Sequence, residues 1–212
     1  MSASPPQGQK YDRFLERVVN EAQRLDADYR NFIALWEAMD EYLDEINEAP
    51  GTFKAFIDGL RVSTIVLTHR LFDESSVGIH ELIRIAETHN EEIDWQGGNL
   101  DATDLQSQRD HIEGFQPTLE RLKKQRHKAY AHLDKKQVLD QEAFAQEFPL
   151  NQDDIRQAID LAHDVLQEHH GARYDLHLEM RIAAAVSVRH LLELIREGRK
   201  FRKEKRKRRL NS

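Results

Sequence analysis

The sequence of 212 residues contains no cysteine. This absence excludes a disulfide framework, a thiolate metal site and a thiol nucleophile, and with them thiol proteases and cysteine zinc ribbons. Glycine is also sparse, and its one adjacent pair, in QGGN at 96–99, lacks the preceding strand and following Lys-Ser/Thr of a phosphate-binding loop. No G-x-S-x-G nucleophile elbow occurs either.

Long apolar runs are missing as well. No stretch approaches the roughly 20 apolar residues that a helix needs to cross a bilayer. The first nine residues, MSASPPQGQ, lack the apolar core of a signal peptide. We therefore expect a cytoplasmic protein with no membrane partner, and a reducing cytosol fits the lack of cysteine.

Charge is unevenly distributed. The net charge is −7, but residues 199–209, RKFRKEKRKRR, hold nine Lys or Arg and one Glu, a net +8. The remaining 22 basic and 37 acidic residues give −15. The basic run is either a solvated extension of the last helix or an arm that binds a polyanion by releasing counterions. In the second interpretation the RNA-binding residues are Arg199, Lys200, Arg202, Lys203, Lys205, Arg206, Lys207, Arg208 and Arg209.

Hydrophobic residues recur with a helical period. Apolar steps of three and four from Tyr11 to Ile46 predict one long helix. Further helices are expected near 52–73, 79–85, 101–132, 151–169 and 176–209, with caps at Asp101 and Asn151 and a kink between Gly114 and Pro117. The predicted fold is all-α, an antiparallel bundle of five to six helices. Its segments are a disordered N-terminal stretch (1–9), a helical domain (10–198) and a basic tail (199–212).

One cation interrupts an apolar stripe. Ile112, Phe115, Leu119 and Leu122 advance by three and four, and the next step falls on Arg126. A buried guanidinium needs a carboxylate, a water-lined groove or an anionic ligand. An internal salt bridge is therefore one interpretation of Arg126 that stays open. His132 lies about 120° around the same helix. The two side chains would converge if the helix breaks between them or a second copy packs alongside.

The eleven histidines do not indicate a metal site. His127 and His132 are five residues apart, and His169 and His170 are adjacent, so neither pair has the i, i+4 spacing that places two imidazoles on one face. We predict no metal and no cofactor.

The segment RHKAYAHLD, at 126–134, resembles the R-x(4–6)-H signature of the HEPN superfamily, especially its abortive-infection-like branch. LTHRLFDESSVGIHELIRIAE, at 67–87, is similar to that branch's helix ending in LFD and the short helix after it. The resemblance covers about residues 10–170. One position departs from the pattern, because active members usually carry Asn or Asp after the Arg, where this chain has His127.

The resemblance implies an all-α domain that dimerises through its motif helices and cleaves RNA without metal. It implies His132 as general base, or as acid in the other protomer, and Arg126 as the phosphate clamp. His127, Lys128 and Asp134 would be auxiliary. The substrate would be RNA, because DNA lacks the attacking 2′-hydroxyl.

Three functions therefore stay open. The first is a HEPN-type ribonuclease, as a toxin or phage-defence component with an antitoxin or another protein as partner. The second is a catalytically inactive HEPN-like module that binds RNA, a nucleotide or a protein through the same groove. The third is a helical scaffold whose tail contacts nucleic acid.

Overall fold

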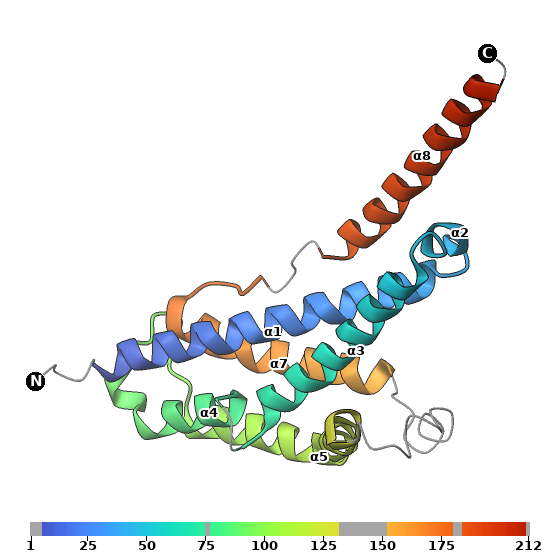
Figure 1. Ribbon diagram of the computed structural model, residues 1–212. Coiled ribbons are helices and arrows are strands. Elements are labelled where there is room, and N and C mark those ends of the chain that lie inside the picture. Colours follow the sequence, from blue (N-terminus) through green and yellow to red (C-terminus); the bar gives the residue numbers. More distant parts are fainter. Residues whose placement is uncertain (1–5, 75–76, 132–151, 180–183, 211–212) are drawn as a thin grey trace, which may run out of the picture. The chain divides into compact units, whose positions relative to one another are not determined.

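The computed structural model describes residues 6–74, 77–131, 152–179 and 184–210, and the side chains of 6–74, 77–124, 152–179 and 188–209. All regular secondary structure in the described residues is helical, with no strand, which confirms the predicted all-α class (Figure 1). The elements are α1 (Gln7–Ala38), α2 (Leu43–Ile46), α3 (Pro50–Phe72), α4 (Ile79–Thr88), the 3-10 helix η1 (Asn90–Glu92), α5 (Ala102–Ala131), α7 (Gln152–Tyr174) and α8 (Ala184–Leu210). None of these helices is long and apolar enough to cross a bilayer.

The chain forms two compact units. Unit 1 comprises residues 1–26 and 62–180, and unit 2 comprises 27–61 and 181–212. The long helices α1 and α3 each contribute one part to each unit.

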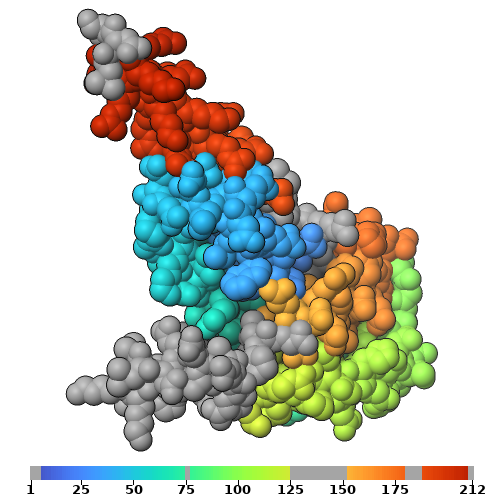
Figure 2. Space-filling view, turned by 90° about the vertical axis from the view of Figure 1, so that its right-hand side faces the viewer, coloured from blue at the N-terminus to red at the C-terminus, as the bar shows by residue number. Residues whose placement is uncertain are grey.

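Unit 1 has a core of large aliphatic side chains. The fully buried ones come from all of its long helices: Leu15, Leu25, Leu71, Ile79, Leu82, Ile83, Leu105, Ile112, Ile155 and Leu166. Helix α5 packs against both α4 and α7, and Figure 2 shows the yellow-green surface of α5 lying against the orange surface of α7. Burial of such side chains, at about 1.5–3 kcal/mol each, is the main force holding these helices together.

A chain of polar contacts runs through this core. The Tyr11 hydroxyl on α1 lies 2.6 Å from His169 Nδ1 on α7, and His169 Nε2 lies 2.9 Å from Gln108 Oε1 on α5. The Gln108 amide nitrogen is 2.6 Å from a carboxylate oxygen of Glu168, which is exposed. The contacts thus join α1, α5 and α7 from the surface to the interior.

The directions of these hydrogen bonds follow from the carboxylate at one end. Glu168 can only accept, so the Gln108 amide donates to it and turns its carbonyl oxygen toward His169. His169 Nε2–H must then donate to that oxygen, which leaves Nδ1 to accept from the Tyr11 hydroxyl. Burial lowers the pKa of His169 to about 3 and raises that of Tyr11, so both groups stay neutral.

The loop after η1 closes the same end of unit 1. Trp95 meets the Tyr11 ring edge-on at 5.4 Å between centroids. Arg173 on α7 binds the Asp12 carboxylate through two nitrogens, at 2.6 and 3.1 Å, and donates to the main-chain oxygen of Asp94. Gly97 lies so close to α7 that an added Cβ would be 2.1 Å from the Gly171 carbonyl oxygen. This position therefore requires glycine.

The predicted first helix is wrong at its C-terminal end. Helix α1 ends at Ala38 and is followed by a turn and the short helix α2, although no Gly or Pro lies between 38 and 46. The break lets Tyr42 and Ile46 join a buried cluster with Val188 and Leu192 of α8. Packing within unit 2 thus overrides the local helical pattern.

Other boundaries differ by a few residues. Helix α1 begins at Gln7, inside the stretch predicted to be disordered, and α5 continues through Pro117 without a break. Helix α7 extends to Tyr174, and Asp175 then adopts a left-handed backbone with φ 55° that ends it. Residues 176–179, predicted to start the last helix, are therefore not helical. Asn151, the predicted cap, lies outside the described residues.

The neutral state of His169 predicts a specific pH dependence. Its pKa in the folded state, about 3, is below the unfolded value of about 6.5, so the unfolded chain binds the extra proton between these limits. The stability contribution is complete above pH 6.5 and falls by about 1.4 kcal/mol per pH unit as the pH drops toward 3. His169→Gln should be less stable at pH 7 but lose stability less steeply between pH 6.5 and 5.

Urea unfolding at several pH values measures this slope. The matched control is His163→Gln, because His163 is a half-exposed histidine of the same helix. We expect this control to keep the wild-type slope. Equal slopes for wild type and His169→Gln would contradict the assigned role.

Candidate functional site

Helix α5 carries the predicted motif, and its start is fixed by Asp101. The Asp101 carboxylate accepts hydrogen bonds from the backbone amides of Thr103 (2.7 Å) and Asp104 (2.9 Å), and the Asp104 carboxylate accepts one from the Asp101 amide (3.0 Å). These backbone amides lower the pKa of Asp101, the Asp104 amide most. The predicted cap is confirmed, and it fixes the residue at which the helix begins.

The predicted catalytic constellation lies at the other end of α5. Arg126, His127 and Lys128 belong to its last turns, but their side chains lie outside the described part of the structure. His132 and Asp134 lie outside the described residues altogether. The backbone is helical through Ala131, so Arg126 does continue the stripe of buried Leu119 and Leu122.

A shallow groove of about 200 Å³ lies between the end of α3 and α5. The end of α3 and the residues after it supply His69, Phe72, Asp73 and Glu74, and α5 supplies Gln116, Leu119, Glu120 and Lys123. His69, which is almost buried, lies with Nδ1 3.6 Å from Asp73 Oδ2. On α5, steps of three and four lead from Gln116 to Leu119 and Lys123, and the next such step is Arg126.

The LFD segment is held beside α5 by close packing. The Phe72 and Phe115 rings are 6.5 Å apart between centroids. Gly78 allows α4 to start directly against the end of α3, because a Cβ there would lie 2.4 Å from the Leu71 carbonyl oxygen. The LFD segment therefore lies next to the middle of α5, the helix that leads to Arg126.

Helix α7 is fixed against the second half of α5. Arg121 of α5 donates to Asp154 in the first turn of α7 at 2.9 Å, and to the Thr118 hydroxyl at 2.9 Å. Together with the buried His169 contacts, this pair attaches α7 to α5 at two separate levels.

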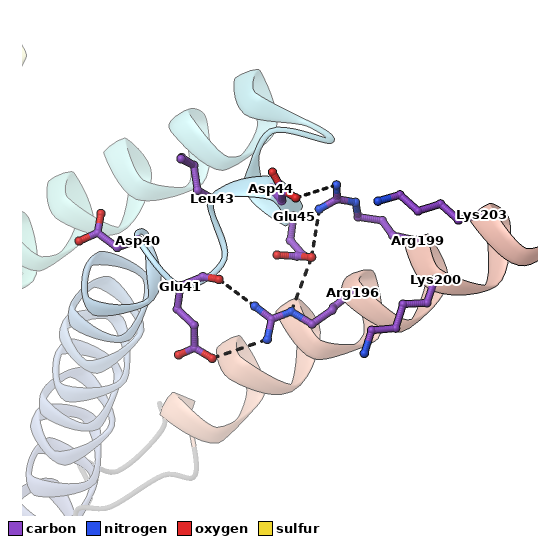
Figure 3. Close-up of a pocket in the computed structure, with 9 residues that line it drawn as sticks. All are labelled: Asp40, Glu41, Leu43, Asp44, Glu45, Arg196, Arg199, Lys200 and Lys203. Carbon is purple, nitrogen blue, oxygen red and sulfur yellow. Dashed lines mark hydrogen bonds and ion pairs between the residues drawn. The ribbon is translucent and has the colours of Figure 1, made fainter.

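Unit 2 brings the basic helix α8 against an acidic turn (Figure 3). Arg199 contacts three carboxylates at 3.1 Å each, those of Asp44, Glu45 and Glu48. It is only 16% exposed, and Glu45 is buried beside it. One residue predicted to bind RNA is therefore engaged by carboxylates of its own chain.

Two further arginines take part in this contact. Arg196 stacks on the Tyr42 ring at 4.0 Å and donates to the main-chain oxygen of Glu41 at 2.8 Å. Arg202 donates to Glu48 at 3.1 Å. The acidic residues of this turn, at 41–48, were not predicted as partners of the basic run. The only indication of this contact in the sequence was the excess of carboxylates in the rest of the chain.

The remaining basic residues of α8 present a different surface. Lys200 and Lys203 line a pocket of about 400 Å³ beside these ion pairs, and no ion pair joins them to the other residues drawn in Figure 3. The residues at 203–209 are all exposed. The second half of the basic run is therefore a cationic helical surface open to solvent.

Within the described part of the chain, no three His, Asp or Glu side chains gather as a metal site would require. The candidate site is thus the C-terminal half of α5 with the groove beside it.

An all-α fold in which α5, the helix that carries Arg126, packs beside the LFD segment is the arrangement expected of a HEPN-type domain of the abortive-infection class. The family model for AbiU2, a HEPN family, matches residues 8–182, and the chain belongs to this family. The resemblance inferred from the two segments is thereby confirmed. Comparison with curated proteins and with solved structures gave no match.

The carboxylates around Arg199 should stabilise unit 2 measurably. Glu45→Ala removes an acceptor from Arg199 and Arg196 in a nearly buried setting, and we expect a loss of about 1–3 kcal/mol of unfolding free energy. Asp58→Ala, which breaks the exposed pair with Lys54, should cost less than about 0.5 kcal/mol.

Denaturant unfolding of both variants compares the nearly buried contact of Glu45 with the exposed pair of Asp58 and Lys54. Each substitution removes one negative charge, so the change in net charge is the same. If the two substitutions had the same effect, the contact between α8 and the acidic turn would be no stronger than an ordinary surface ion pair.

Proposed function

We propose that this AbiU2-family chain is a metal-independent endoribonuclease of the HEPN type that acts as a toxin or phage-defence component. The active site would comprise Arg126 and His132 from two copies of the chain. The observation that supports the proposal is the helical register of α5, in which Arg126 takes the next position of the stripe after the buried Leu119 and Leu122.

The chemistry needs only protein side chains. Imidazole, with an ordinary pKa of about 6.5, can take the proton from a ribose 2′-hydroxyl as that oxygen attacks the adjacent phosphorus. Arg126 would stabilise the extra negative charge on the phosphorane. The 5′-oxygen then leaves with a proton from the imidazolium, the protonated His132, of the other copy, and the products are a 2′,3′-cyclic phosphate and a 5′-hydroxyl.

The cationic surface at 203–209 supports RNA as the substrate. Exposed Lys and Arg along one helix bind phosphates regardless of sequence and make affinity depend steeply on salt. Arg199 and Arg202 would contribute less, because carboxylates of the acidic turn already bind them.

A second candidate is an inactive HEPN module that binds RNA without cleaving it. The observation that favours it is His127, which stands where active members of the superfamily usually carry Asn or Asp.

Cleavage of a mixed RNA substrate in EDTA separates these functions. Arg126→Ala and His132→Ala should each lower the rate at least about 100-fold, the usual minimum for a lost general base or charge stabiliser. Arg156→Ala and His163→Ala are matched controls, because both residues are solvent-exposed to a substantial degree on α7, and they should cleave at the wild-type rate.

Undiminished cleavage by His132→Ala would contradict the assigned site. RNA binding without cleavage by the wild type, weakened by Arg126→Ala, would establish the inactive module instead.

A further inference from the structure

A second groove, of about 370 Å³, lies in unit 1 where α1 runs beside the end of α3 (Figure 1). Four of its lining residues are arginines and two are glutamates: Arg13, Glu16, Arg17, Glu21, Arg24 and Arg70. The charged lining is therefore net positive in a chain whose overall charge is −7. The lining of this groove includes no residue of α5 and none of the basic run at 199–209.

The arginines of α1 form a straight stripe. Arg13, Arg17 and Arg24 are separated by four and seven residues, which places them on one face of the helix. At 1.5 Å per residue, they are spaced by about 6 and about 10 Å along the axis. The stripe is thus longer than one phosphate group and is long enough to contact more than one phosphate of an extended strand.

Glu21 holds arginines of this groove in place without cancelling its net positive charge. Glu21, only 16% exposed, accepts from Arg70 at 2.6 Å and lies 3.9 Å from Arg17 through the same oxygen. Arg17 and Arg70 nevertheless remain 57% and 46% exposed. A guanidinium has five N–H donors in a planar fork, so the one carboxylate oxygen that lies 3.9 Å from Arg17 leaves most donors of that side chain available to a ligand.

We propose that this groove binds the sugar–phosphate backbone of a single RNA strand. The guanidinium forks of α1 contact successive phosphates, and Arg70 borders the groove from α3. The groove extends the proposed ribonuclease function to a surface that positions the strand, but it takes part in no chemical step. Its test therefore measures binding alone and gives a result whether or not the chain cleaves RNA.

The probe is a fluorescent 12-nucleotide 2′-O-methyl RNA, which cannot be cleaved through its 2′-oxygen, with affinity measured by anisotropy between 50 and 200 mM salt. Each phosphate contact to a single strand contributes about 0.7 to the slope of log affinity against log salt. Arg13→Ala/Arg17→Ala should lower the magnitude of the slope by about 1.4, which makes the loss of affinity over this range roughly sevenfold smaller.

Two double variants serve as controls. Lys54→Ala/Arg156→Ala removes the same charge from exposed residues that also have i, i+4 carboxylates, and it should keep the wild-type slope. Arg13→Lys/Arg17→Lys keeps the charge and should keep the slope. Circular dichroism melting of every variant verifies that the fold is retained.

Three results would overturn the proposal. The first is an unchanged slope in Arg13→Ala/Arg17→Ala, and the second is an equal change in the Lys54/Arg156 control. The third is an Arg13→Ala/Arg17→Ala variant that loses affinity for poly-glutamate but keeps its affinity for RNA, which would identify the ligand as an acidic peptide.

Discussion

The imidazole of His169 joins three helices that lie far apart in the sequence. Its two nitrogens bond Tyr11 of α1 and Gln108 of α5, while its own helix, α7, meets α5 again through Arg121 and Asp154. A fully buried polar group is costly unless each of its atoms has a partner, so this arrangement selects one packing of α1, α5 and α7 over others. The register of α5, and with it the position of Arg126, depends on that packing.

Charge in this chain is organised by local pairing. Carboxylates of the acidic turn at 41–48 form ion pairs with the first arginines of the basic run on α8. Glu21 pairs with Arg70 and Arg17 beside the α1 stripe. The chain can therefore be acidic overall and still present separate cationic surfaces. Because Coulomb interactions in water are screened within about 10 Å, a polyanion responds to these local surfaces more than to the net charge.

Local signals in the sequence predicted the all-α class, the Asp101 cap and the family resemblance, because each depends on residues close together in the chain. The end of α1 at Ala38 was not predictable, since it depends on burying Tyr42 against α8, far along the sequence. The same holds for His169, whose partners are 158 and 61 residues away. Of the candidate site, the sequence supplied Arg126 and His132, but only the structure showed the groove from His69 to Lys123 and the carboxylates around Arg199.

The central claim is that the end of α5 promotes attack by a ribose 2′-hydroxyl. Mass spectrometry of the products tests it directly, with an RNA oligonucleotide and a matched one carrying a single 2′-deoxy nucleotide at the cleaved position. The account predicts 2′,3′-cyclic phosphate and 5′-hydroxyl ends from the first and no cleavage at that position in the second. Products with 3′-hydroxyl and 5′-phosphate ends, or equal cleavage of both oligonucleotides, would contradict it.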